Sequence, residues 1–183
     1  MAGAPYDIFV SANELNPNEL YKNGLTLDAP KTYALGQLVV WTHSQTDLSE
    51  WWSNEPSKVA LANPETAPYG IAAKEVLQAL QLMEKWDQDL VYGESIAQVN
   101  QFVNSGAASI GFTAGSVVRS PELQAKGSWI AVADSLHSPI AQGAVILKNK
   151  EDDYRQARNF YDFLFSDKAR EILLNFGYTA IGE

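Results

Sequence analysis

Two short segments of the chain have the composition of helix N-termini that can hold an anion. The first, residues 63–70, reads Asn-Pro-Glu-Thr-Ala-Pro-Tyr-Gly, and the second, residues 94–98, reads Glu-Ser-Ile-Ala-Gln. About four backbone N–H groups at a helix start lack an intrahelical acceptor, and the helix dipole places roughly half a positive charge there. Such a terminus can bind an oxyanion without a Lys or Arg side chain.

Individual residues within the two segments favour this interpretation. Pro68 suits the first helical position, where its missing N–H has no cost, and Gly70 allows the backbone to approach a bound group closely. Ser95 and Gln98 have the spacing of a capping box. Each segment alone is typical of an ordinary capped helix. The hypothesis of an anion site therefore rests on the presence of both.

Composition and charge argue against several functional classes. A formal net charge of −9 with only 13 Lys and Arg residues disfavours a nucleic-acid or anionic-membrane partner. The absence of Cys excludes disulfides, thiolate metal sites and Cys nucleophiles. The 46% hydrophobic content predicts a substantial core, in one domain or two small lobes. No signal-peptide pattern opens the sequence and the longest apolar runs are too short to cross a bilayer, so the chain as written is expected to be soluble and unexported.

Short β-rich runs alternate with helical patterns along the chain. Buried strands are predicted at residues 6–11, 36–41, 58–62, 108–113 and 143–147, with a weaker candidate at 129–132. Amphipathic helices are predicted at 71–85, 96–104, 152–165 and 166–174, the last capped by Ser166 and ended by Gly177. This alternation predicts an α/β fold with a mostly parallel sheet and right-handed crossovers.

Patterns typical of catalysis or of metal binding are missing. His43 and His137 are the two histidines, and neither lies in a nucleophile or metal-ligand motif. The acidic pairs at 87/89 and 152/153 are more typical of solvated charges at helix ends or turns than of a catalytic carboxylate pair. We therefore expect neither enzymatic activity nor a bound metal cation.

Several segments together resemble the periplasmic molybdate-binding proteins of ABC importers. These segments are residues 3–12, 62–70 with 73–75, 94–96, 110–112, and the closing stretch from 160–164 to 175–178. Their order and spacing cover nearly the whole chain. The resemblance implies a periplasmic binding protein type II-like α/β fold with two lobes, which hold the oxyanion between them without a counter-cation and with a size-selective cavity. It also implies a periplasmic location, an ABC permease in the membrane as partner, and no cofactor.

The resemblance further implies lobe boundaries and ligand contacts. Residues 1–38 and 144–183 are expected to form the remnant of one lobe and residues 39–143 the other. The backbone donors to the oxyanion fall on Tyr69 and Ile96, with Pro68 and Ser95 beside them at the same helix starts. Ala114 stands where several family members carry a Tyr hydroxyl, and we expect Tyr69 to replace that hydroxyl in part.

Against the family pattern, the sequence lacks an N-terminal signal peptide and a first βαβ unit. We therefore expect an N-terminally truncated form with impaired binding, whose Met1 is either a native start or an artificial boundary. The sequence does not choose between molybdate and tungstate. Two alternatives stay open: a homo-oligomeric interaction module that binds no ligand and pairs through exposed sheet edges, or a binding protein for another tetrahedral oxyanion such as sulfate.

Overall fold

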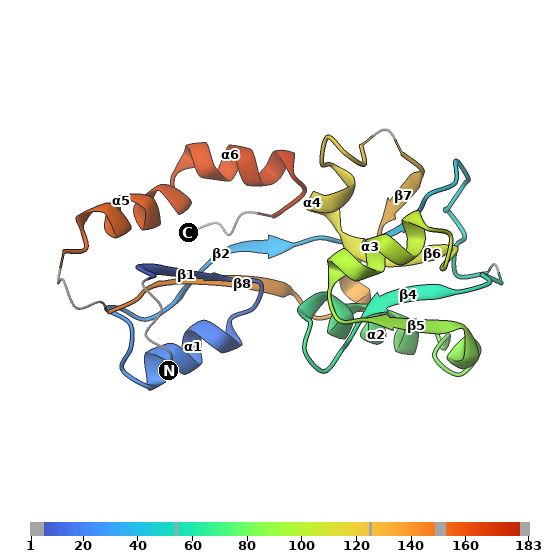
Figure 1. The fold of residues 1–183 in the computed structure, drawn as a ribbon, viewed down its shortest axis with the longest axis horizontal. Helices are drawn as coiled ribbons and strands as arrows, with labels where there is room; N and C mark the ends of the chain where they lie inside the picture. Colours follow the sequence, from blue (N-terminus) through green and yellow to red (C-terminus); the bar gives the residue numbers. More distant parts are fainter. Residues whose placement is uncertain (1–5, 54, 125, 149–152, 180–183) are drawn as a thin grey trace. The chain divides into compact units, whose positions relative to one another are not determined.

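The chain divides into two compact α/β units. The computed structural model describes residues 6–53, 55–124, 126–148 and 153–179 (Figure 1). Unit 1 comprises Met1–Gly36 and Ala141–Glu183, and unit 2 comprises Gln37–Ile140. A three-stranded sheet has the order β1-β8-β2, and a five-stranded sheet has the order β5-β4-β6-β3-β7. None of the helices in the described part of the chain is long and apolar enough to span a membrane.

Unit 1 is built on the three-stranded sheet. Its elements are β1 (Ile8–Ser11), α1 (Leu15–Lys22), β2 (Lys31–Gly36), β8 (Ile140–Ile146, of which the first residue belongs to unit 2), α5 (Arg155–Leu164) and α6 (Asp167–Asn175). Strands β1 and β8 pair antiparallel, with Ile8 opposite Ile146. Ala144 and Ile146 of β8 pack with Ala157 and Tyr161 of α5 in a small buried cluster.

Tyr33, a partly buried tyrosine in unit 1, is expected to make the stability of the folded chain vary with pH in the alkaline range. The Tyr33 hydroxyl donates to Gln142 Oε1 at 2.6 Å, and burial, with a smaller effect of Tyr178, raises the pKa of Tyr33 from 10.0 to about 12. Because the folded pKa exceeds the unfolded one, the stabilisation is complete below about pH 10 and is lost as the pH rises towards 12. We expect the Tm to fall across this range, and to fall less in Tyr33→Phe. Equal Tm–pH profiles for both proteins would contradict this assignment.

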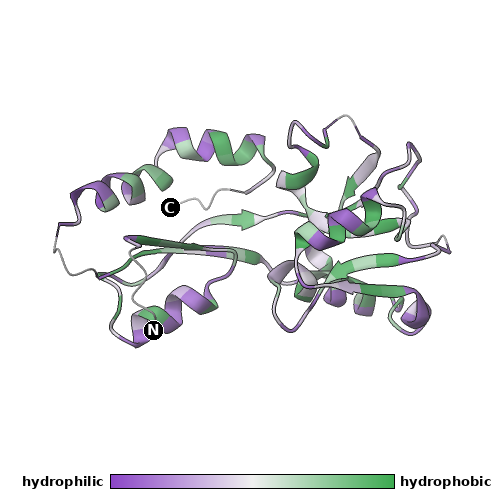
Figure 2. Cartoon of the chain, in the orientation of Figure 1, coloured by the Kyte–Doolittle hydropathy of each residue, from purple (hydrophilic) through white to green (hydrophobic). Residues whose placement is uncertain are grey.

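Unit 2 is built on the five-stranded sheet. Its elements are β3 (Leu38–Thr42), β4 (Val59–Ala62), α2 (Pro68–Ala79), η1 (Asp87–Asp89), β5 (Leu90–Gly93), α3 (Ile96–Asn104), β6 (Ile110–Ala114), α4 (Gly115–Val118), β7 (Ser128–Ala131) and η2 (Asp134–Leu136). Strand β3 shows why these runs are continuously apolar: Leu38 and Val40 lie in one core cluster, Val39 and Trp41 in another. Successive side chains point to opposite faces, so a strand buried on both faces has no polar positions. Figure 2 shows the hydrophobic residues concentrated on the strands, whereas the helices carry both hydrophobic and hydrophilic residues.

The prediction of a mostly parallel sheet is wrong. Strand β4 pairs parallel with β5 and β6, but β3 pairs antiparallel with β6 and β7, as β1 does with β8. Parallel neighbours need a long crossover connection, usually a helix. The stretch β4-α2-β5-α3-β6 supplies such crossovers, and β4 is accordingly parallel to both β5 and β6.

The helix predicted at 71–85 is shorter at its C-terminal end, because α2 stops at Ala79. Gln81 adopts a left-handed conformation with φ 58°, and its N–H donates to Gln78 O at 3.0 Å while Leu82 N–H donates to Leu77 O at 2.7 Å. These two bonds form a Schellman motif, which ends a helix. The position usually holds Gly or Asn, so Gln81 gave no recognisable stop signal.

Candidate functional site

Strands β4 and β5 end side by side, and a helix begins just after each of them. Ala62 lies opposite Gly93 in the parallel ladder, and Asn63 N–H donates to Gly93 O at 2.7 Å. Because carboxyl ends of parallel strands share one edge of the sheet, α2 and α3 both begin at that edge, which is where ligands bind in open α/β sheets. The structure therefore brings the two helix starts singled out in the sequence to the same edge of unit 2 (Figure 1).

The turn before α2 is held by Asn63. Its carbonyl oxygen accepts from the N–H groups of Thr66 at 3.2 Å and Ala67 at 2.9 Å, and its Oδ1 accepts from Glu65 N–H at 2.9 Å. An Asn side chain that bonds to the backbone two residues on is typical of a tight turn. This turn fixes the direction in which α2 leaves the sheet.

Pro68 occupies the first turn of α2, as predicted, after the extended N-cap residue Ala67. The Ala67 carbonyl accepts from Gly70 N–H at 2.9 Å and from Ile71 N–H at 3.0 Å. Tyr69 is the second residue of the helix, so its N–H points along the axis towards the N-terminal end. Tyr69 as a whole is 5% exposed and belongs to the same core cluster as Ala114. The side chain of Tyr69 thus anchors the helix start in the core.

Gly70 permits close packing of α2 on the end of β4. A Cβ at this position would lie 2.2 Å from Ala62 O and 2.8 Å from Ala62 C. The sequence predicted a close approach of this backbone to a bound group. In the structure the close approach is to the chain's own backbone, which fixes the start of α2 against the strand.

Ser95 is the N-cap of α3, and its Oγ accepts from Gln98 N–H at 3.4 Å. The second half of the predicted capping box differs, because Gln98 Oε1 accepts from Glu94 N–H at 2.7 Å and not from the N–H of Ser95. Ile96 and Ala97 are the first two helical residues, and neither N–H finds a hydrogen-bond acceptor among the residues that the structure describes. The start of α3 therefore presents two backbone donors.

Neither of the two helix starts carries a basic side chain. Residues 63–73 and 94–104 contain no Lys, Arg or His, so positive potential arises from the helix dipoles and the first-turn N–H groups. Glu65 and Glu94 are acidic residues beside the two starts, and both are exposed. Solvent and salt screen exposed charges. The arrangement is thus suited to an anion that is bound through neutral hydrogen-bond donors.

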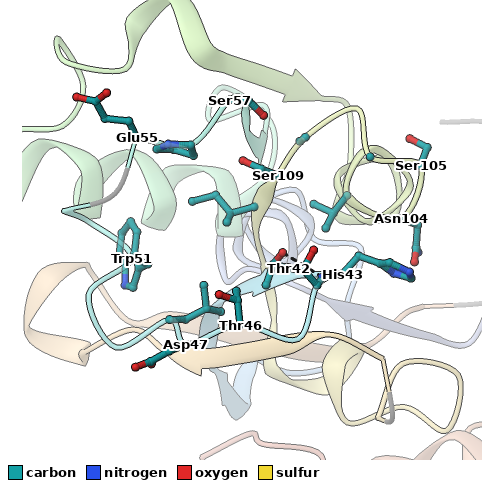
Figure 3. A pocket seen from close by; sticks show the side chains of 17 residues that line it. Thr42, His43, Thr46, Asp47, Trp51, Glu55, Ser57, Asn104, Ser105 and Ser109 are labelled. Atoms are coloured by element: carbon teal, nitrogen blue, oxygen red, sulfur yellow. Dashed lines mark hydrogen bonds between the residues drawn. The ribbon is translucent and has the colours of Figure 1, made fainter.

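A pocket of about 590 Å³ lies at the opposite edge of the unit 2 sheet (Figure 3). It is formed where β3 ends and β4 and β6 begin, and its lining includes Thr42, His43, Asp47, Trp51, Glu55 and Asn104. None of the four predicted site residues lines it. Backbone and side-chain bonds from Ser49 lower the pKa of Asp47, and in the described part of the chain His43 has no hydrogen-bonded nucleophile. This pocket therefore lacks a nucleophile–base pair.

Three of the other residues that the sequence offered for catalysis, Asp89, Asp153 and His137, are in ordinary contacts. Asp89 pairs with Lys58 at 3.0 Å and Asp153 with Arg155 at 2.8 Å, whereas Asp152 lies outside the described residues. His137 Nδ1 lies 2.8 Å from Ser138 O. Within the described ranges, no group of three or more His, Asp or Glu side chains has a geometry that could hold a metal ion.

One contact near the site was not predicted. Glu75, in α2, accepts from Ser138 N–H through Oε2 at 2.6 Å and from Ser138 Oγ through Oε1 at 3.2 Å. The two residues are 63 positions apart. Because neither residue lies in a local sequence motif, no signal in the sequence could have predicted their contact.

Comparisons with known proteins agree with this architecture. The family model described as bacterial extracellular solute-binding protein matches residues 1–179. The molybdate-binding protein ModA of Azotobacter vinelandii is 39% identical over 181 residues, which cover 96% of this chain and 71% of that protein. ModA of Rhodobacter capsulatus is 37% identical, with 97% of this chain and 70% of that protein covered.

A solved structure supports the fold assignment. The periplasmic molybdate-binding protein of Azotobacter vinelandii matches with a TM-score of 0.87 and 32% identity, over 98% of this chain and 80% of that chain. The α/β class and the type II binding-protein fold predicted from the sequence are thereby confirmed. The chain belongs to the family of bacterial extracellular solute-binding proteins.

Proposed function

We propose that this chain binds molybdate or tungstate as the solute-binding component of an ABC importer. The observation that carries the proposal is the meeting of two helix starts at one edge of the unit 2 sheet, after β4 and β5. The names of the relatives from Azotobacter and Rhodobacter, both molybdate-binding proteins, support this choice of oxyanion. A periplasmic location and an ABC permease as partner follow from the same proposal.

The backbone N–H groups of Tyr69 and Ile96 donate to the oxyanion in this proposal. Pro68 has no N–H and contributes a preset backbone conformation, while Ser95 caps α3 and keeps its first turn in place. Hydrogen bonds to an ionised acceptor are roughly twice as strong as neutral ones. Two helix dipoles directed at one dianion add further stabilisation without a cation.

The direct test is the effect of oxyanions on thermal unfolding. A ligand that binds only the native state, at about 100 times its Kd, stabilises it by about 2.7 kcal/mol. In a chain of this length we expect molybdate or tungstate to raise the Tm by roughly 5–10 °C at that concentration. Sulfate and phosphate, matched for ionic strength, should raise it less.

The outcomes of this test separate the candidate functions. A larger shift with sulfate than with molybdate would favour the alternative of another tetrahedral oxyanion. If millimolar molybdate and tungstate both left the Tm unchanged, and calorimetry detected no binding, the proposed function would be wrong.

A further inference from the structure

We infer that Glu75 is a positioning residue for oxyanion binding, because it fastens the segment that leads into β8 to the helix that carries Tyr69. The inference rests on the proposed function. It extends that function in one respect. Helix α2 presents the Tyr69 N–H to the ligand, and it also couples ligand contact at its first turn to the point where the chain leaves unit 2. The residues that make this coupling are Glu75 and Ser138.

The contact between Glu75 and Ser138 is two-pronged. One carboxylate oxygen of Glu75 accepts from Ser138 N–H at 2.6 Å, and the other from the Ser138 hydroxyl at 3.2 Å. A bond from a backbone N–H to a charged carboxylate belongs to the stronger class of hydrogen bonds. On the other side of Ser138, its carbonyl oxygen lies 2.8 Å from His137 Nδ1. The three polar groups of Ser138 are therefore all in contact with neighbours.

Ser138 lies two residues before Ile140, where the strand that leaves unit 2 begins. Pro139 follows it, and Ile140 is the first residue of β8 and the last of unit 2. The ring of Pro139 fixes its own φ and restricts the residue before it. Ile140 is 4% exposed and belongs to the same core cluster as Tyr69. The path from Glu75 to the boundary at Ala141 is thus short and constrained.

Helix α2 can transmit a displacement from Tyr69 in its first turn to Glu75. Tyr69 and Glu75 are separated by less than two helical turns, and the hydrogen-bonded backbone between them is stiff. Gly70 packs its backbone directly on Ala62 at the end of β4. Since packed elements move as units, a shift at the first turn of α2 on ligand binding moves Glu75, and Glu75 holds Ser138.

Replacing Glu75 with Ala should weaken molybdate binding and break the coupling. We expect the affinity to fall about two- to thirtyfold, the range measured when residues that couple two sites are changed. Glu75→Gln keeps one carbonyl acceptor for Ser138 N–H and should recover part of the loss. Glu84→Ala is the matched control, since it removes the same charge from an exposed residue for which the described part of the chain shows no ion pair or hydrogen bond.

Two measurements distinguish a positioning role from a purely structural one. Calorimetry with sodium molybdate gives the affinities of the wild type and the three variants. Amide hydrogen exchange, with and without molybdate, follows Ser138 and the first turn of α3. In the wild type we expect molybdate to slow exchange at both places. In Glu75→Ala the slowing should persist at Ile96 and Ala97 but disappear at Ser138.

The possible failures can be told apart. If the wild type binds molybdate, and Glu75→Ala binds it equally well with Ser138 still protected by the ligand, the inference is wrong while the proposed function stands. If the wild type binds neither molybdate nor tungstate, the proposed function fails first. Circular dichroism verifies that Glu75→Ala is folded. If it is not, the same comparison with Glu75→Leu, which is similar in size but has no acceptor for Ser138 N–H, decides, and an unchanged affinity and unchanged protection there would equally overturn the inference.

Discussion

Replacing Ile96 with Pro should lower the affinity for molybdate about ten- to a hundredfold, because it deletes the first N–H of α3. A hydrogen bond to a charged group contributes roughly 1.5–3 kcal/mol. Proline is well tolerated at the first helical position, which Ile96 occupies. The residue before a proline must be extended, and Ser95 already has φ −151° and ψ 166°. The helix should therefore form normally, and the substitution removes the N–H donor together with the Ile96 side chain.

Ile96→Ala is the matched control for this substitution. It removes the side chain, which packs partly buried against the core, but keeps the N–H. We expect Ile96→Ala to bind molybdate nearly as well as the wild type in calorimetry, and Ile96→Pro to bind it far more weakly. Equal affinities for the two variants would show that Ile96 N–H is not a ligand donor. Position 69 permits no equally clean test, since Tyr69→Pro also removes a buried aromatic ring.

Helices with local start and stop signals were predicted well. Helix α3 spans Ile96–Asn104 as expected, because Ser95 caps its start and its apolar residues recur on one face. Helix α6 begins after Ser166, whose side chain accepts from Ala169 N–H, and Gly177 follows its end with φ 79°. These signals act within four or five residues, so the sequence alone shows them.

Elements that depend on distant contacts were missed. Strand β5, Leu90–Gly93, has only four residues, with Tyr92 49% exposed, and its pattern does not differ from that of a loop. It exists because β4 supplies a parallel partner for it. Strand β2 and helix α1 were missed as well. The strand predicted at 6–11 was expected to be buried, yet Val10 is 44% exposed.

The candidate site shows the same division between local and distant information. Ser95, Pro68 and Tyr69 marked two helix starts from sequence alone, because capping residues and an early proline act locally. That both starts lie at one edge follows from the pairing of Ala62 with Gly93, and this pairing needs β5, which the sequence did not reveal. The contact between Glu75 and Ser138 likewise exists only in the folded chain.

Replacing Gly70 with Ala should lower the free energy of unfolding by about 1–3 kcal/mol, and molybdate affinity should fall with it. The added Cβ would lie 2.2 Å from Ala62 O. This oxygen is a backbone atom of a buried strand, so it cannot rotate away as a flexible side chain could. The start of α2 must therefore move off β4. Because Tyr69 directly precedes Gly70, its N–H moves with the helix start.

Urea unfolding followed by circular dichroism measures the first effect of Gly70→Ala, and calorimetry at a temperature where the variant is folded measures the second. Ile71→Ala is the control on the same turn, since Ile71 is 46% exposed and exposed substitutions usually change stability by less than about 0.5 kcal/mol. A Gly70→Ala protein with wild-type stability would show that α2 can shift without penalty. Wild-type affinity in a destabilised Gly70→Ala would separate packing at the end of β4 from oxyanion binding, and would place the donors elsewhere than at the start of α2.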